Sequence, residues 1–258
     1  MRFEEKWSNF SIRQIKNELF VPLDSPQIFT AASGEPQIFG PEIGLARQLY
    51  TDGVGPISII KVAFPDTSLA VNWLGSGNNL TDQLVTFANR ELADQAKVGV
   101  LGVVGALYWY QGESDAMSAT LSAAYQLNLV DFISEVRQQI PFAEGAPVIL
   151  VKESLAETLS LEQAAGTCPE PDCATAASWD EAVRSADDWA VTNLVNVAEV
   201  DSIGLPRLNV FVHLTNVGEL AIGHMMAQVS EPYLFSLEGK AATSAARREK
   251  RDFAGHSS

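Results

Sequence analysis

The sequence predicts an α/β fold in which helices cover both faces of a parallel central sheet. Short apolar runs typical of buried strands alternate along the chain with longer stretches whose apolar residues recur at helical spacing. Strands separated by helices of this length form parallel sheets, because each crossover returns the next strand to the same direction. The strands are expected at residues 57–64, 98–110, 147–151 and 194–200.

The expected helices lie between and after these strands. Apolar residues repeat at helical spacing over residues 80–96, 119–139 and 216–235. Another helix is expected to begin at Ser178, because Glu181 stands three residues later in a capping-box pattern.

Composition indicates one domain of generous size. The chain has 258 residues, of which 47% are hydrophobic, enough to fill a substantial core. We expect that domain to span residues 1–237, with a diverged N-terminal part over residues 1–36 and a disordered basic tail over residues 238–258. The net charge of −15 argues against a nucleic acid as partner. No apolar run reaches the length of a membrane-spanning helix, and residues 1–6 lack the apolar stretch of a secretory signal.

The most informative segment is residues 109–115, Trp-Tyr-Gln-Gly-Glu-Ser-Asp, at the end of the second expected strand. An amide, a glycine and two carboxylates arrive together at this point. In open α/β sheets, reactive groups gather at the carboxyl ends of the strands, which makes the segment a candidate site. The alternative is an ordinary turn, because glycine and aspartate are common turn residues.

His213 is the best-placed of the three histidines. His256 stands in the polar tail, and His224 stands inside the last expected helix. His213 precedes a plausible helix cap at Thr215 or Asn216, so we expect its imidazole on a loop at an edge of the sheet. A histidine in that place suits general-base catalysis, and an ordinary loop histidine is the alternative.

Together the two segments resemble the sialate O-acetylesterase-like branch of the SGNH hydrolases, which includes carbohydrate esterase family 6. That branch shows a W-x-Q-G-E-x-D strand end and, late in the chain, an H-L-T-x-x-G segment, matched here by residues 109–115 and 213–218. A Gly-Pro-Glu block at residues 40–42 and a Thr-Ser-Leu-Ala block at residues 67–70 agree with it. The resemblance covers roughly residues 37–232 and implies a three-layer α/β/α flavodoxin-like fold with a parallel central sheet.

The resemblance also implies a reaction, the hydrolysis of O-acetyl esters on carbohydrates by a serine nucleophile, with no metal or organic cofactor. In this reading His213 is the general base and Glu113 is the carboxylate that supports it. Gln111 matches the family's side-chain donor to the oxyanion. Gly40 and Gly112 are further candidates for oxyanion or substrate binding. The implied partner is an acetylated carbohydrate.

Two departures from the family pattern concern the catalytic residues. The family places its serine in a Gly-Gln-Ser-Asn block directly after the first strand, and the nearest match here keeps only Ser8 and Asn9. Ser8 is therefore the candidate nucleophile, ahead of Ser11 and Ser25, and the first strand is expected to be missing or degenerate.

The second departure is at the family's aspartate three residues before the histidine, where this chain has Val210. Valine cannot accept a hydrogen bond through its side chain. The two departures together favour an alternative function, that of a catalytically inactive relative that binds glycans or is a remnant of the fold.

The chain has two cysteines, Cys168 and Cys173, which flank the sequence Pro-Glu-Pro-Asp. A span of this length can close as a small disulfide loop, which would favour an oxidising, extracellular compartment. Two cysteines without neighbouring ligands make a poor metal site.

Overall fold

A computed structural model gives the architecture of the chain. It describes residues 10–14, 21–22, 40–54, 57–77, 79–100, 102–153, 155, 157, 159–160, 166, 172–207 and 213–254, and within these ranges it describes side chains from residue 40 to residue 235.

The strands form two short sheets. In the first, the order is β2-β1-β3, and β1 runs parallel to β3 and antiparallel to β2. The second has the order β4-β5-β6 and is parallel throughout. The strands are β1 (Phe10–Gln14), β2 (Val21–Pro22), β3 (Ile57–Lys61), β4 (Leu107–Tyr110), β5 (Val148–Lys152) and β6 (Val197–Asp201). The parallel pairings confirm the predicted parallel sheet.

The helices account for most of the remaining described residues. They are α1 (Glu42–Thr51), the short π-helix η2 (Leu69–Trp73), α2 (Leu80–Lys97), α3 (Ala119–Gln139), α5 (Cys173–Asn193) and α6 (Asn216–Ala254). Helix α3 has the predicted bounds, and α2 extends one residue beyond them. No described helix combines the length and the apolar character that crossing a membrane requires.

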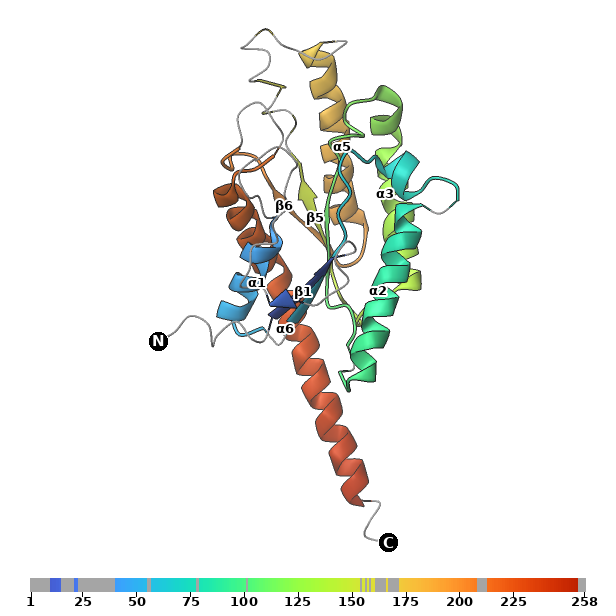
Figure 1. Cartoon of the computed structure of the whole chain (residues 1–258), viewed down its shortest axis with the longest axis vertical. Coiled ribbons are helices and arrows are strands. Elements are labelled where there is room, and N and C mark those ends of the chain that lie inside the picture. Colours follow the sequence, from blue (N-terminus) through green and yellow to red (C-terminus); the bar gives the residue numbers. More distant parts are fainter. Residues whose placement is uncertain are drawn as a thin grey trace.

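Helices cover both faces of the β4-β5-β6 sheet, as Figure 1 shows. Because side chains alternate along a strand, Trp109 and Leu150 point to one face, where α2, α3, α5 and η2 supply the rest of a large core. Tyr108 and Val151 point to the other face and pack against apolar side chains of α1 and α6. This three-layer arrangement confirms the predicted α/β/α fold.

Helix α5 begins five residues before the predicted start at Ser178. Asp172 is its N-cap, and its carboxylate accepts the backbone N–H of Thr175 at 2.8 Å. Ser178 lies inside the helix, where its hydroxyl donates to the backbone oxygen of Thr175 at 2.7 Å. The capping-box prediction at Ser178 is therefore wrong, because an aspartate one turn and a half earlier caps the helix instead.

The second predicted strand is much shorter than residues 98–110. Only Leu107–Tyr110 pair as a strand, and before them a single bridge joins Val104 to Phe142. At the C-terminus, α6 continues to Ala254, so a helical backbone is found over most of the segment that was expected to be a disordered tail.

Candidate functional site

The segments that follow β3 and β4 are joined by hydrogen bonds. The side-chain amide nitrogen of Gln111, directly after β4, donates to the backbone oxygen of Thr67 at 3.0 Å. The same nitrogen donates to the carboxylate of Asp115 at 2.7 Å. Both hydrogens of this buried amide are therefore used inside the protein.

Asp115 adds a second connection between the segment after β3 and the turn after β4. Its carboxylate is fully buried and also accepts the backbone N–H of Leu69, the first residue of η2, at 2.8 Å. Burial raises the pKa of Asp115, and the bonds from Leu69 and Gln111 oppose that rise. Tyr125 of α3 also holds this turn, because its hydroxyl donates to the backbone oxygen of Gln111 at 3.0 Å.

Gly112 allows the chain to turn here. Its φ of +152° is unfavourable for residues with side chains, and a Cβ at this position would lie 2.9 Å from Val183 Cγ1 and 3.2 Å from Glu153 Cγ. The turn thus presses against α5 and the end of β5, which only glycine permits.

Glu113 and His213 come within electrostatic range of each other. Burial is the largest influence on Glu113 and raises the pKa of its carboxyl. The charge of His213 lowers that pKa, as do hydrogen bonds from the backbone amides of Gly112 and of Glu113 itself. The charge of the predicted base therefore acts on the predicted supporting carboxylate, and Glu113 also has the backbone contacts of an ordinary turn residue.

The backbone around His213 is anchored by its neighbours. Leu214 is buried in the core that α1 and α6 share, and it forms an antiparallel bridge with Arg207. Thr215 caps α6, because its hydroxyl accepts the backbone N–H of Gly218 at 3.2 Å. The predicted cap is confirmed. It leaves the exposed His213 side chain on the loop just before the helix.

Gly40 lies beside the ion pair between Lys61 and Glu42. Lys61 Nζ, at the end of β3, lies 2.8 Å from Glu42 Oε1, at the start of α1. A Cβ on Gly40 would lie 2.6 Å from Glu42 Oε2 and 2.8 Å from Lys61 Nζ. Space around Gly40 is thus limited by charged side chains.

Glu219, in the first turn of α6, interacts electrostatically with the Lys61–Glu42 pair and with the last residue of β4. The pKa of Glu219 is raised to about 8, first by burial and then by the charge of Glu42, while the charge of Lys61 opposes the rise. Tyr110, the last residue of β4, has a raised pKa caused first by burial and then by the charges of Glu113 and Glu219. The charges of both acidic side chains thus act on Tyr110.

A second pair of acids lies behind the Gln-Gly-Glu turn. Glu153, directly after β5, and Asp180 of α5 are both buried and are hydrogen-bonded to each other. Burial raises the pKa of Glu153 well above its usual range, and Asp180 and Glu113 both add to the rise.

Sequence reasoning missed Glu153, Asp180 and Glu219, since each stands in a different element. One signal was available for Asp180, because Asp180, Arg184 and Asp187 recur at positions i, i+4 and i+7 on one face of α5, and all three are buried. A helix that buries three charged residues on one face indicates a polar network behind it.

Several predicted residues lie outside the part of the chain that the structure describes. They are Ser8, Ser25, Val210 and Cys168; Ser11 belongs to β1, but its side chain is not described. A strand near the N-terminus is present, β1, and it follows Ser8 in the sequence. Cys173 is disulfide-bonded, and its Sγ lies 3.4 Å from the backbone oxygen of Leu159.

No group of three or more His, Cys, Asp or Glu side chains within the described ranges is arranged to hold a metal ion.

Comparison with known proteins identifies the family of the chain. Residues 3–231 match the model of the family described as carbohydrate esterase, sialic acid-specific acetylesterase. A search of curated proteins finds no match.

Among solved structures, the X-ray structure of a protein from Arabidopsis thaliana is similar in fold, with a TM-score of 0.64 and 21% identity over 89% of this chain and 82% of the plant protein. The resemblance inferred from the Gln-Gly-Glu and His-Leu-Thr segments is confirmed by the family match, which covers both. The chain belongs to the carbohydrate esterase family of sialic acid-specific acetylesterases.

Proposed function

We propose that this protein hydrolyses O-acetyl esters on carbohydrates, with His213 as the general base and Glu113 as the carboxylate that supports it. The proposal is carried by the Gln-Gly-Glu turn after β4, whose buried carboxyl Glu113 feels the charge of His213, a loop residue just before α6. Membership in a family of carbohydrate esterases supports the class of substrate. We further propose that residues 1–237 act as a single domain, in keeping with a family match over residues 3–231.

In the proposed reaction, a serine hydroxyl attacks the acetyl carbon while His213 takes its proton. The tetrahedral intermediate then expels the sugar oxygen, which receives that proton, and an acetyl-enzyme remains. Water repeats the sequence and releases acetate. Glu113 holds the imidazole in position and stabilises its charged form. Ser8 is the proposed nucleophile.

Gln111 is proposed to stabilise the oxyanion through its side-chain amide. Its two amide hydrogens are donated to Thr67 and Asp115, so this role requires one bond to be exchanged for a bond to the substrate. The longer bond, 3.0 Å to Thr67, is the natural one to give up, because Asp115 is charged and buried.

A second candidate function is glycan binding without turnover. The engagement of both Gln111 hydrogens favours it, because an amide locked by Asp115 and Thr67 is a poor oxyanion donor. Val210, in place of the family's aspartate, favours it too. In this case the site would hold an acetylated sugar and leave its ester intact.

Acetate release from an O-acetylated sialic acid and from acetylxylan separates the two functions. The purified chain is expected to release acetate, and His213→Ala and Ser8→Ala are each expected to lose about 10³-fold or more in kcat/KM. Glu113→Gln is expected to lose about 10-fold or more, because the amide no longer stabilises the imidazolium. His224→Ala, which removes an exposed histidine of α6, is the matched control and is expected to keep full activity.

Two results would redirect the proposal. Activity that survives Ser8→Ala but not His213→Ala would move the nucleophile to another residue, and Ser11→Ala and Ser25→Ala would then be assayed. A folded chain that binds the acetylated sugar in calorimetry but releases no acetate would establish the glycan-binding function instead.

A further inference from the structure

Three carboxyl groups from three different elements gather behind the Gln-Gly-Glu turn. Glu113 belongs to the turn itself, Glu153 follows β5, and Asp180 lies on α5. Each influences another: Asp180 and Glu113 both raise the pKa of Glu153, and Asp180 raises that of Glu113. Glu153 is only 2% exposed and Asp180 is fully buried. Three negative charges so close together in the interior would repel one another strongly.

The contact between Glu153 and Asp180 requires a proton. Their carboxyl groups are hydrogen-bonded to each other, and two ionised carboxylates have no hydrogen to share. Glu153 Oε2 accepts the backbone N–H of Leu155 at 2.5 Å. The other oxygen, Oε1, is buried and finds no donor among the described residues while both acids are ionised. A proton between the two acids removes this deficit.

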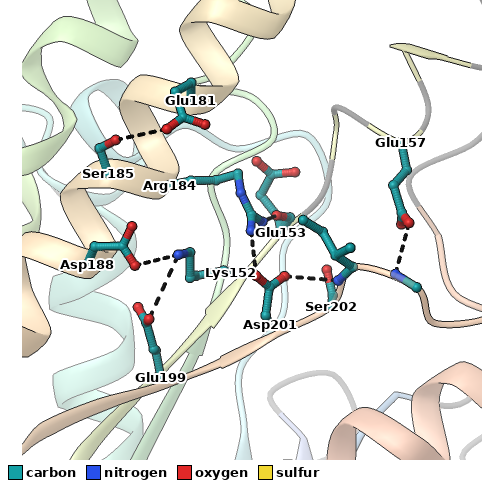
Figure 2. A network of polar contacts seen from close by, with 12 residues as sticks. Lys152, Glu153, Glu157, Glu181, Arg184, Ser185, Asp188, Glu199, Asp201 and Ser202 are labelled. Carbon is teal, nitrogen blue, oxygen red and sulfur yellow. Dashed lines mark hydrogen bonds and ion pairs between the residues drawn. The ribbon is translucent and has the colours of Figure 1, made fainter.

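The nearest cations form their side-chain hydrogen bonds with other acids. The guanidinium of Arg184 donates to the backbone oxygen of Glu153 and, at 2.6 Å, to the carboxylate of Asp201, as Figure 2 shows. Lys152, the preceding residue, is directed to Asp188 and Glu199. The charge of Arg184 also acts on Glu153 and Asp180, but one cation cannot offset the charges of Asp201, Glu153 and Asp180 together.

The remaining titratable groups around the cluster make Glu113 the best place for a negative charge. Tyr125, on α3, lies close to Gly112 and has a pKa raised well above its usual range by burial, so it stays neutral. Glu113 receives hydrogen bonds from two backbone amides and faces the charge of His213. Neither of these stabilising contacts reaches Glu153.

We propose that Glu153 and Asp180 share one proton in the folded protein, and that Glu153 acts as a positioning residue that leaves Glu113 as the carboxylate facing His213. This inference rests on the proposed function, since it concerns the ionised partner of the general base. The shared proton prevents a second charge behind Glu113 that would push its carboxylate away.

The first test is infrared spectroscopy of the carboxyl groups, which reports the proton without any assay of activity. The wild-type chain at neutral pH is expected to show a protonated-carboxyl band that disappears in Glu153→Gln, beside the absorption of Glu219 and Asp187, whose pKa values are also raised and which stays in that variant. The band is also expected to disappear in Asp180→Asn, because the new amide donates to Glu153 and no shared proton is needed. Glu181→Gln, at an exposed position next to Asp180 on α5, is the matched control and should leave the band unchanged.

Two outcomes would overturn the inference. One is a protonated-carboxyl spectrum that is the same in wild type, Glu153→Gln and Asp180→Asn. The other is a band that survives both variants and is lost in Glu113→Gln, which would put the proton on Glu113. If both interior variants fail to fold, the chain with Glu219→Gln and Asp187→Asn decides, because these two buried acids with raised pKa values then no longer contribute. A protonated-carboxyl band that persists in it well above the pH at which exposed glutamates ionise supports the shared proton, and its absence overturns it.

The second test is the pH profile of hydrolysis. As pH rises, loss of the shared proton adds a charge behind Glu113, so kcat/KM of the wild type is expected to fall at the pH where the infrared band vanishes. Glu153→Gln cannot lose that proton, so its profile is expected to lack this fall. A fall at the same pH in Glu153→Gln would overturn the positioning role. A chain that shows the band but no hydrolysis would refute the proposed function and leave the shared proton standing.

Discussion

Asp115 accepts the backbone N–H of Leu69 at 2.8 Å, which ties the turn after β4 to the first residue of the π-helix after β3. The same carboxylate oxygen accepts the amide of Gln111 at 2.7 Å. The buried side chain of Asp115 therefore holds both Gln111, the candidate oxyanion donor, and the start of η2 at Leu69. The segments after the two strands stay together because of this residue.

Asp115→Asn is expected to destabilise the protein. An asparagine oxygen can take the place of Oδ2, which accepts both donors, but the two buried hydrogen bonds lose the assistance of the carboxylate charge, at a cost of about 1–3 kcal/mol. Urea unfolding monitored by fluorescence measures the loss. Asp131→Asn, on an exposed position of α3, is the control and should change the free energy of unfolding little. Equal stability of the two variants would show that Asp115 does not join the segments.

Gly112→Ala is expected to destabilise the turn through a clash as well as through backbone strain. The added Cβ would lie 2.9 Å from Val183 Cγ1, so α5 must shift, which costs about 1–3 kcal/mol in a packed core. Gly99→Ala separates the two effects, because Gly99 also has a positive φ, +85°, but nothing within 4 Å of the new Cβ. Thermal unfolding of both variants gives the comparison, and a larger loss in Gly99→Ala would contradict the close packing of the turn.

Helices were the most predictable part of this fold. The bounds of α3 follow from its apolar spacing, because its core-facing residues alone decide which stretch can pack. The strand that ends in β4 was overestimated, because hydrophobicity does not report pairing. Val98, Val100 and Val103 read as strand residues but are 78%, 52% and 59% exposed.

The candidate site was predictable only where its residues are neighbours in sequence. Gln111 and Glu113 stand out as polar residues at the end of an apolar run, and Thr215 marks His213 as a loop residue before a helix. No comparable sequence signal marks Glu153 and Asp180 as neighbours of this site. Whether an acid is buried beside another acid depends on how β5 and α5 pack, which the spacing of single residues does not reveal.

Stability is expected to depend on pH through Glu219. Its pKa is raised from 4.5 to about 8 in the folded protein, so the folded state holds this proton more tightly than the unfolded chain. The stabilisation is complete below the unfolded pKa and is lost as pH rises toward 8. Glu219→Gln cannot lose a proton, so its stability relative to wild type is expected to increase between about pH 5 and pH 9.

Urea unfolding of wild type and Glu219→Gln at a series of pH values measures this difference. Glu144→Gln, in an exposed turn, serves as the control and should run parallel to wild type. A constant difference between Glu219→Gln and wild type across the series would mean that Glu219 is not held protonated in the fold.

Lys152→Met tests the ion pairs at the end of β5. Lys152 is largely buried, and its ammonium lies 2.5 Å from Asp188 and 3.8 Å from Glu199. Burial already raises the pKa of Glu199 to about 7, and the charge of Lys152 opposes that rise. Removal of the cation is therefore expected to raise the pKa of Glu199 further, which carboxyl NMR titration measures.

The same variant is expected to lose about 1–3 kcal/mol of stability, because a charged hydrogen bond of a buried side chain disappears. Lys97→Met breaks an exposed pair of similar length, 2.7 Å to Asp94, and such pairs contribute about 0.5 kcal/mol or less. A loss in Lys152→Met no larger than that in Lys97→Met, together with an unchanged titration of Glu199, would show that burial adds nothing to the Lys152 pairs. The two lysines differ strongly in exposure, since the side chain of Lys152 is 10% exposed and that of Lys97 is 74% exposed.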